Sequence, residues 1–312
     1  MSATPGPVAF GLQLPVQSQS TVFVQSWERG AGPAEIVQVA RACEAAGFDY
    51  VAVCDHVAIP SAQAEAMGTE WWDTIATLSY LAAVTSRVRL LSHVYVLPYR
   101  HPLVVAKAWA TLDALSGGRA ILGAGVGHVA GEFEALDVSF DDRGAALDEA
   151  IDAVRAALTD EFATHHGARW SFADVGARPR PVQTSLPIWV GGSSKPAMRR
   201  AAERGDGWLP QGPPKEGMAA GIDFVRAHRA SGPRATLPFA IGALSGPLYL
   251  GDPPAELGRC VRGTADKIAA YLRTYRDLGV DQIQVGFVSR SADELTDQIA
   301  AFGAEIAPLV NQ

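Results

Sequence analysis

The sequence has few cysteines and lacks the common motifs of hydrolases. Its three cysteines, Cys43, Cys54 and Cys260, are far apart and form no C-x-x-C pair, so neither a disulfide framework nor a zinc site is expected. The H-E-x-x-H and G-x-S-x-G motifs are also missing, which leaves zinc-dependent and serine hydrolysis without support. We therefore predict that the protein binds no metal.

The sequence also lacks signals for a membrane or a nucleic acid. It has no basic N-terminal region followed by an apolar stretch, and no uncharged apolar run of about 18 residues. The formal net charge is −7, and the charged residues are spread along the chain rather than gathered in basic clusters. We expect a cytoplasmic protein that acts on a small molecule and contacts neither nucleic acid nor membrane.

What the sequence does contain is a regular alternation of two kinds of segment. Short β-branched or apolar runs alternate with longer amphipathic runs, as in βα units that build a parallel sheet. The predicted strands are 8–14, 50–54, 88–96, 119–122, 187–190, 207–209, 238–244 and 282–286. The predicted helices are 34–46, 74–85, 103–115, 145–158, 196–204, 215–230, 265–278 and 292–307. This order predicts one α/β domain over residues 1–312, a (β/α)8 TIM barrel, with an open doubly wound sheet as the alternative.

Three segments do not fit the alternation. Residues 160–184 are predicted to form an irregular insertion before the fifth strand, and residues 18–32 and 59–69 follow the first and second strands. In a barrel, the last two would be loops at the C-terminal ends of strands, where active-site residues belong. Gly47 and Gly279 each follow a predicted helix, where a left-handed residue commonly ends the helix.

An acid and an imidazole stand side by side at the end of the second predicted strand. Asp55 and His56 would therefore lie on the catalytic rim of a barrel. Histidine exchanges protons near neutral pH, and the neighbouring carboxylate would fix its orientation. A structural role for Asp55 in the loop is the alternative.

Two glycine-rich segments follow the fourth and fifth predicted strands. The first contains Gly123, Gly125 and Gly127, but His128 stands where a dinucleotide fingerprint needs its third glycine. Gly125 and Gly127 would then let the backbone approach a flat ligand, with simple turn formation as the alternative. The second segment contains Gly191, Gly192, Ser193 and Ser194 and leads into a helix, which predicts an anion site or an ordinary serine cap.

Several longer segments carry a resemblance to a known family. They are FGLQLP (10–15), AAGFDYVAVCDH (45–56), AAVTSRVRLLSHVYVLPYRHP (82–102), KAWATLDALSGGRAILGAGVG (107–127), EFEAL (132–136), PRPVQ (179–183), PIWVGGSS (187–194) and RRAAERGDGWLP (199–210). In this order, the segments resemble the luciferase-like monooxygenase superfamily, and in particular its branch that depends on the deazaflavin coenzyme F420. The match covers most of the chain.

The resemblance implies a barrel in which the coenzyme ring lies across the strand ends. It implies contacts from Asp55 and His56 to the polar edge of the ring, and a phosphate near the loop from Gly191 to Ser194. It also implies a cis peptide bond against the ring, at Val94-Tyr95 or its neighbour, and a homodimer. No uninterrupted apolar surface helix identifies the dimer interface in the sequence.

One residue departs from the family pattern. His128 stands where sugar-phosphate dehydrogenases of the superfamily have a glutamate after the fourth-strand glycines, so we do not transfer their substrate to this chain. Our hypothesis is that reduced F420 delivers hydride to an unsaturated acceptor, with His56 or His128 supplying the proton. The aromatic residues predicted to form an apolar substrate wall, or otherwise simply to pack, are Trp71, Trp72, Tyr95 and Trp208.

Two other functions remain open at this stage. The first keeps the fold but binds flavin mononucleotide (FMN) and performs monooxygenation. The second is a non-catalytic binding or partner protein, which would have no affinity for either coenzyme and would tolerate His56→Ala.

Overall fold

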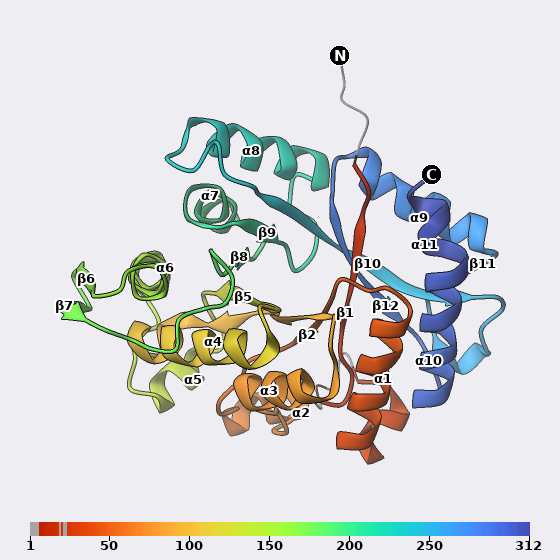
Figure 1. Cartoon of the computed structure of the whole chain (residues 1–312). Helices are drawn as coiled ribbons and strands as arrows, with labels where there is room; N and C mark the ends of the chain where they lie inside the picture. Colours follow the sequence, from red (N-terminus) through yellow and green to blue (C-terminus); the bar gives the residue numbers. More distant parts are fainter. Residues whose placement is uncertain (1–5, 19, 21–23) are drawn as a thin grey trace.

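Eight parallel strands form a closed barrel in the computed structural model, which describes residues 6–18, 20 and 24–312 (Figure 1). In their order around the barrel, the strands are β1 (Ala9–Gln13), β2 (Tyr50–Val53), β3 (Arg89–Ser92), β5 (Ala120–Gly125), β8 (Ile188–Gly191), β9 (Gly207–Leu209), β10 (Ala240–Leu250) and β12 (Gln282–Phe287). Parallel pairing of β9 with β10 and of β12 with β1 closes the ring. The predicted (β/α)8 barrel is therefore confirmed, and the open-sheet alternative is wrong.

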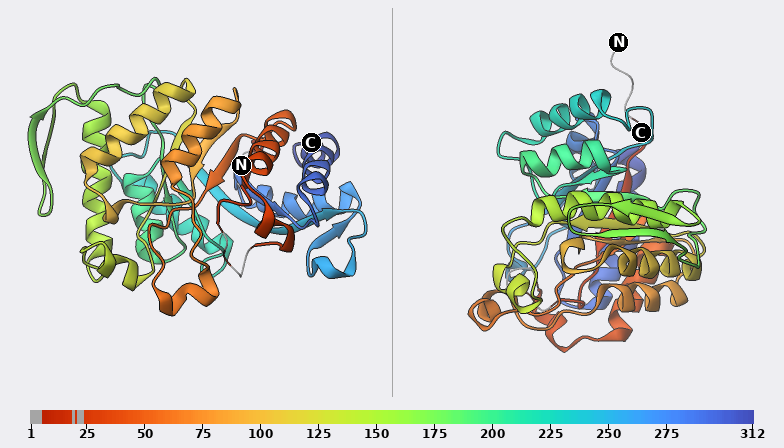
Figure 2. Two further views of the ribbon diagram at one scale, coloured as in Figure 1. Left: turned by 90° about the horizontal axis from the view of Figure 1, so that it is seen from below. Right: turned by 90° about the vertical axis from the view of Figure 1, so that its left-hand side faces the viewer.

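Helices cover the outside of the barrel, as the two views of Figure 2 show. The long ones are α1 (Pro33–Ala45), α3 (Thr74–Val84), α4 (Pro102–Ser116), α6 (Arg143–Thr159), α7 (Lys195–Arg204), α8 (Met218–Ser231), α9 (Ala265–Asp277) and α10 (Ala292–Ala301). They correspond to the eight predicted helices, with ends shifted by a few residues. Gly47 and Gly279 have φ values of 79° and 84°, as predicted for residues that end helices. In the described part of the chain, no helix has the length and apolar character to cross a membrane.

Short elements fill the connections between the long ones. They are α2 (Ala64–Met67), α5 (Ala130–Ala135), α11 (Ala307–Val310), a π-helical turn (Phe302–Ile306), 3-10 turns at Ser26–Gly30, Ser61–Gln63, Leu97–Tyr99 and Ala255–Leu257, and β11 (Val261–Gly263), which pairs with β10. The predicted helix 292–307 contains the π-helical turn, and none of the other short elements was predicted, because such short segments do not establish a hydrophobic period. The most consequential of these elements is α5, which follows β5 and carries a residue of the candidate site.

The insertion before the fifth barrel strand contains a β-hairpin. Strands β6 (Ala163–His166) and β7 (Ser171–Val175) pair antiparallel and project from the side of the barrel (Figure 2). Glu149 on α6 accepts hydrogen bonds from backbone N–H groups in the hairpin turn, including that of Trp170 at 2.8 Å. The prediction of an insertion is confirmed, but residues 163–175 form a hairpin, so the prediction of an irregular segment is wrong for this part and holds for residues 176–184.

The third predicted strand is interrupted. The chain leaves β3 after Ser92, passes through a cis peptide bond between His93 and Val94, and pairs again with β5 as β4 (Tyr95–Val96). The cis bond lies immediately before the bond first expected from the family resemblance. The segment 88–96 is therefore two short strands rather than one.

The lower interior of the barrel is filled by a cluster of apolar and aromatic side chains. Tyr50 and Ala52 point inward, while the alternating Val51 and Val53 pack in the outer core beneath the helices. A Cβ atom at Gly11 would lie 2.1 Å from the ring of Tyr50, so this ring needs a glycine opposite it. The interior cluster consists of Tyr50, Ala52, Leu91, Ile121, Trp189 and Leu209. Because this layer is packed, the chemistry belongs at the C-terminal ends of the strands.

The Asp281→Asn variant should be more stable than the wild type above about pH 6. Burial raises the pKa of Asp281 to about 6 from an ordinary value of 3.8, although its carboxylate accepts a hydrogen bond from the Ile241 N–H at 3.0 Å. Because the folded pKa exceeds the unfolded one, this group's contribution to stability is complete below about pH 4 and is lost as the pH rises to about 6. We expect Asp281→Asn to gain about 1 kcal/mol in urea unfolding at about pH 8, and little at about pH 4. A gain that is equal at both pH values would contradict this account.

Candidate active site

The predicted site residues gather at one end of the barrel. His56, Val94, Gly125 and Gly191 follow or end β2, β3, β5 and β8, which are neighbours in the barrel. All these strands run parallel, so their C-terminal ends form one continuous rim. The predicted Asp55–His56 segment and the loop from Gly191 to Ser194 therefore lie at the same end of the molecule.

Asp55 is a buried anchor of the rim. Its carboxylate accepts both guanidinium N–H groups of Arg100, at 2.7 and 2.8 Å, as well as the backbone N–H of Val96 at 2.8 Å and the Thr74 hydroxyl at 3.2 Å. The Arg100 guanidinium also lies 3.9 Å from the ring centre of Tyr95. These contacts tie the end of β2 to β4 and α3. They favour the structural alternative for Asp55 over the predicted contact with a coenzyme.

His56 is held by a carboxylate that the sequence analysis did not single out. The Nδ1 atom of His56 lies 2.8 Å from Oε2 of Glu132, whose side chain on α5 is fully buried. The same carboxylate accepts hydrogen bonds from the Tyr99 hydroxyl at 2.9 Å and from the backbone N–H of Ala58 at 3.1 Å. Glu132 was present in the EFEAL segment of the family resemblance, but nothing in its spacing pointed to His56, 76 residues earlier.

The charge state of Glu132 follows from these contacts. Burial by itself would raise its pKa, but the hydrogen bonds from His56 and from the backbone N–H groups of Val57 and Ala58 outweigh it and hold the pKa below its usual range. Glu132 is therefore ionised at neutral pH. An ionised carboxylate can only accept hydrogen bonds, so every group that faces it acts as a donor.

Two further rings surround His56. The Trp71 ring meets it edge to face with centroids 4.3 Å apart, and the His128 ring does so at 5.6 Å. His128 reaches solvent. Partial desolvation of the His128 ring by the surrounding protein lowers the pKa of His128, and the nearby imidazole of His56 lowers it further. The structure thus brings both predicted histidines together on the rim, His56 inside and His128 toward the solvent.

The glycines of the rim make room for protein side chains. A Cβ atom at Gly125 would lie 2.0 Å from Cγ2 of Val94, and one at Gly191 would lie 2.5 Å from its Cγ1. At Gly127, where φ is 77°, a Cβ atom would come within 2.8 Å of the Phe133 ring. We predicted that the missing side chains of Gly125 and Gly127 leave room for a flat ligand. In the structure, the side chains of Val94 and Phe133 occupy the spaces beside these two glycines. Val94, after the cis bond, forms this part of the rim.

The loop after β8 leads into a capped helix. Ser194 caps α7 by accepting a hydrogen bond from the Ala197 N–H at 3.4 Å, and the Ser193 hydroxyl donates to the Gly212 carbonyl at 2.5 Å. Trp208 Nε1 donates to the Gly192 carbonyl at 2.8 Å. The cap predicted as the alternative for Ser194 is confirmed. It holds the N-terminal end of α7, where the helix dipole favours an anion, on the same rim as His56.

Two of the four predicted wall aromatics belong to the core. Trp208 is 1% exposed and packs in the outer core, and Tyr95 is 5% exposed with its ring 5.8 Å from that of Trp109. For these two the packing alternative is the better description, because both side chains are buried in the core cluster. Trp71 and Trp72 are half-buried, and the backbone N–H of Trp72 donates to the Gln17 carbonyl at 3.0 Å. Trp71, against His56, is the wall candidate that remains closest to the histidines.

Polar side chains form a layer above the packed interior. His93 is buried, with Nδ1 3.0 Å from Oε1 of Gln284 on β12. Burial lowers the pKa of His93 to about 4, so this histidine is neutral at physiological pH. Gln13 on β1 donates to the Cys54 sulfur at 2.9 Å. These groups lie between the aromatic cluster and the rim that carries His56.

The fold and the rim define a TIM-barrel protein whose histidines and anion-favouring helix end share the face where enzymes of this fold bind their ligands. A family model described as luciferase-like monooxygenase matches residues 10–259. The chain therefore belongs to the luciferase-like monooxygenase family, whose members are oxidoreductases and monooxygenases.

Curated relatives include proteins with and without an assigned activity. An uncharacterized protein of Mycobacterium tuberculosis is 34% identical over 221 residues, which cover 67% of this chain and 76% of the relative. An F420-dependent glucose-6-phosphate dehydrogenase of Kineococcus radiotolerans is 32% identical and covers 57% of this chain and 52% of its own. An FMNH2-dependent dimethylsulfone monooxygenase of Pseudomonas putida is 31% identical, with 50% and 44% covered.

Solved structures share the fold at lower identity. Monooxygenase RslO1 from Streptomyces bottropensis has a TM-score of 0.77 at 22% identity, covering 96% of this chain and 99% of its own. The F420-dependent tetrahydromethanopterin reductase of Methanopyrus kandleri has a TM-score of 0.75 at 17% identity, covering 97% and 99%. These similarities establish the barrel architecture over nearly the whole chain.

Proposed function

We propose that the protein is a coenzyme F420-dependent oxidoreductase that transfers a hydride between the deazaflavin and a small organic substrate, in the direction of substrate reduction. The observation that carries this proposal is the position of His56, which an ionised carboxylate holds on the same barrel rim as the N-terminal end of α7. The F420-dependent relative at 32% identity supports the choice of coenzyme.

The residues of the rim fit such a coenzyme chemically. F420 carries a phosphate on its side chain, and the N-terminal end of α7 favours an anion through the helix dipole. Lys195 in the first turn adds a positive charge, which also lies 3.8 Å from Glu216. The carboxylates nearest to His56 do not oppose this fit, because Arg100 neutralises Asp55 and four donors surround Glu132. When bound, the deazaflavin supplies hydride chemistry at a ring carbon and reacts poorly with oxygen.

The protein's own part in the reaction is to position the substrate and to move a proton. We assign the proton step to His56, with His128 as the alternative donor at the solvent side. Trp71 lies against His56 and supplies an apolar surface that excludes water from one side of the imidazole. In a site of this kind, orientation and general acid catalysis account for most of what the protein must contribute.

An FMN-dependent monooxygenase is the second candidate. The observation that favours it is the relative from Pseudomonas putida, which is 31% identical and depends on FMNH2. The same anion-favouring loop suits the phosphate of either coenzyme. A non-catalytic binding protein is the third candidate, and the pairing of His56 with Glu132 argues against it, because an imidazole oriented by a carboxylate at the strand ends is the arrangement that proton transfer needs.

The reaction itself distinguishes these candidates. The purified protein is mixed with reduced F420 in the absence of oxygen, and oxidation of the deazaflavin is followed by absorbance against a panel of unsaturated acceptors. The proposal predicts oxidation that depends on an acceptor and needs no oxygen. Turnover only with reduced FMN and oxygen would favour the monooxygenase, and no turnover in either assay would favour the binding protein.

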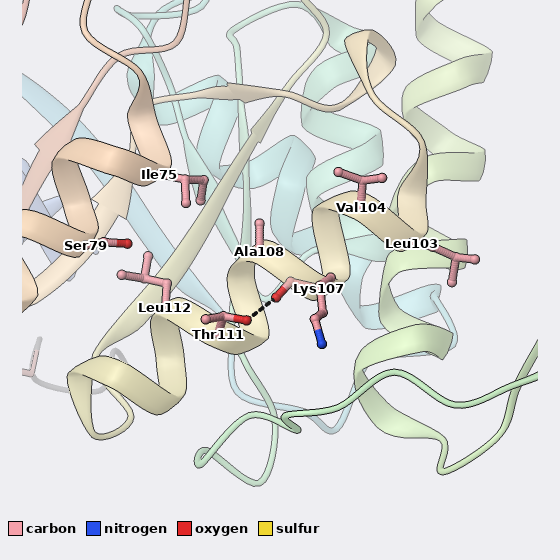
Figure 3. Close-up of a pocket in the computed structure, with 8 residues that line it drawn as sticks. All are labelled: Ile75, Ser79, Leu103, Val104, Lys107, Ala108, Thr111 and Leu112. Atoms are coloured by element: carbon pink, nitrogen blue, oxygen red, sulfur yellow. Dashed lines mark hydrogen bonds between the residues drawn. The ribbon is translucent and has the colours of Figure 1, made fainter.

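We also propose that the protein forms a homodimer through the outer face of α3 and α4. Figure 3 shows the residues that line a mostly apolar groove between these helices. Its lining residues are Ile75, Ser79, Leu103, Val104, Lys107, Ala108, Thr111 and Leu112. Val104 is 61% exposed and Leu115, further along α4, is 68% exposed. Exposed apolar side chains next to an apolar groove suit a second copy of the same surface, as in an isologous dimer.

The Val104→Glu variant should weaken this dimer. A charge placed beside the apolar groove would have to be buried without a partner, which costs a few kcal/mol and raises the dissociation constant by about 100-fold. Light scattering coupled to size-exclusion chromatography measures the change. Leu237→Glu is the matched control, because Leu237 is 46% exposed but lies outside the groove. A wild-type monomer, or equal dissociation by both variants, would contradict the interface.

A further inference from the structure

We propose that Glu132 is a positioning residue that fixes the tautomer of His56, so that Nε2 is the atom through which His56 exchanges protons with the substrate. This inference rests on the proposed function for its catalytic meaning. Its structural content, the location of the hydrogen on the imidazole, can be tested without any coenzyme.

Four groups face the Glu132 carboxylate. Oε1 faces the backbone N–H groups of Val57 and Ala58, and Oε2 faces the Tyr99 hydroxyl and Nδ1 of His56. The Glu132 side chain is fully buried, so its oxygens are not exposed to bulk solvent. The two backbone groups can only donate, and they fix Oε1 as an acceptor.

The tautomer of His56 follows from the remaining oxygen. Oε2 of an ionised carboxylate has no hydrogen to give, so Nδ1 of His56 must carry one for the 2.8 Å contact to be a hydrogen bond. In the neutral imidazole, Nε2 then holds the lone pair, and in the protonated imidazole it holds the hydrogen that can leave. The proton therefore enters and leaves at Nε2, on the ring edge opposite Glu132.

The same contacts explain why Glu132 is more than a support for the loop. The bonds to Val57 and Ala58 would hold the loop whether or not His56 faced the carboxylate. The bond to Nδ1 adds an orienting effect, because it selects one of two tautomers of similar intrinsic stability. The Tyr99 hydroxyl donates to the same oxygen and helps to keep the carboxylate oriented toward His56.

Replacement of Glu132 by glutamine gives an opposite prediction for the tautomer. In Glu132→Gln, the amide oxygen still has to face the N–H groups of Val57 and Ala58, so the amide NH2 turns toward Nδ1 of His56. Nδ1 must then accept, and the hydrogen moves to Nε2. The structure thus predicts that one isosteric change inverts the neutral tautomer of His56.

Nitrogen NMR of the apoprotein tests this directly. Protein labelled with 15N-histidine is studied above the titration range of its histidines, and the His56 signals are assigned by their loss in His56→Gln. We expect the Nδ1–H form in the wild type and in Tyr99→Phe, which keeps the carboxylate, and the Nε2–H form in Glu132→Gln. Thermal unfolding of each variant checks that it is folded. A wild-type Nε2–H form, or an unchanged tautomer in folded Glu132→Gln, overturns the inference.

Turnover with the coenzyme gives the second readout. Glu132→Gln should lower kcat by about 10²-fold or more, because it places the wrong atom toward the substrate, while the dissociation constant of the coenzyme stays within a factor of about three. Loss of coenzyme binding with an unchanged kcat would overturn the positioning role. If the wild type turns over neither coenzyme, the proposed function fails, and the NMR result still decides the tautomer.

Discussion

The His56→Gln variant is expected to lose about 10²- to 10⁴-fold in kcat while it retains the coenzyme. His56 is the imidazole that the protein holds most firmly on the rim, with Nδ1 paired to Glu132 and one face against Trp71. Glutamine has a similar reach and can hydrogen-bond to Glu132 through its NH2 group, but it exchanges no proton near neutral pH. The expected loss is the usual contribution of a general acid or base.

Steady-state kinetics and a coenzyme titration measure the two halves of this prediction. His166→Gln is the control, because His166 lies on the projecting β6–β7 hairpin and is exposed. If His56→Gln keeps its kcat and His128→Gln loses it, the proton step belongs to His128. If both keep it, the rim histidines have no part in the chemistry.

The Asp55→Ala variant is expected to lose about 3 kcal/mol of unfolding free energy. The change leaves the guanidinium of Arg100, whose side chain is 15% exposed, without its two hydrogen bonds to the carboxylate. It also removes the acceptor of the Val96 N–H, beside the interrupted β3–β4 segment. An uncompensated charge in a mostly buried place costs more than the ion pair itself contributes.

Urea unfolding of purified variants measures this loss. Glu161→Gln is the matched control, because it breaks an ion pair with Arg178 on the surface. The Arg178 side chain is 74% exposed and the Glu161 side chain is 63% exposed. An exposed pair contributes little, so this control should unfold almost as the wild type does. Equal effects of the two substitutions would show that Asp55 is not the anchor described here.

Much of the architecture was predictable because it depends on local patterns. Inward-facing and outward-facing residues alternate along each strand, and the glycines that end helices stand one residue beyond the last turn. These features identified the eight barrel strands and the eight long helices, although not the β6–β7 hairpin. The family resemblance also predicted the cis bond to within one position, at His93-Val94.

The parts of the site that were not predictable depend on contacts between distant segments. Glu132 contacts His56 only because the segment after β2 and helix α5, which follows β5, lie on the same rim. Gly125 on β5 and Gly191 on β8 leave room for the Val94 side chain, which comes from the segment between β3 and β4. Tyr95 and Trp208 were assigned to a substrate wall from their sequence positions, yet both side chains are directed into the core by the alternation of their strands.

Equilibrium binding of F420 and FMN to the apoprotein, measured by ultrafiltration, tests the central claim most directly. The account predicts that the wild type retains F420 at least about 10-fold more tightly than FMN, a difference of about 1.4 kcal/mol. It also predicts that Ser193→Asp, which brings a negative charge to the loop before α7, loses both coenzymes. Retention of FMN alone, or of neither coenzyme by the wild-type protein, would contradict it.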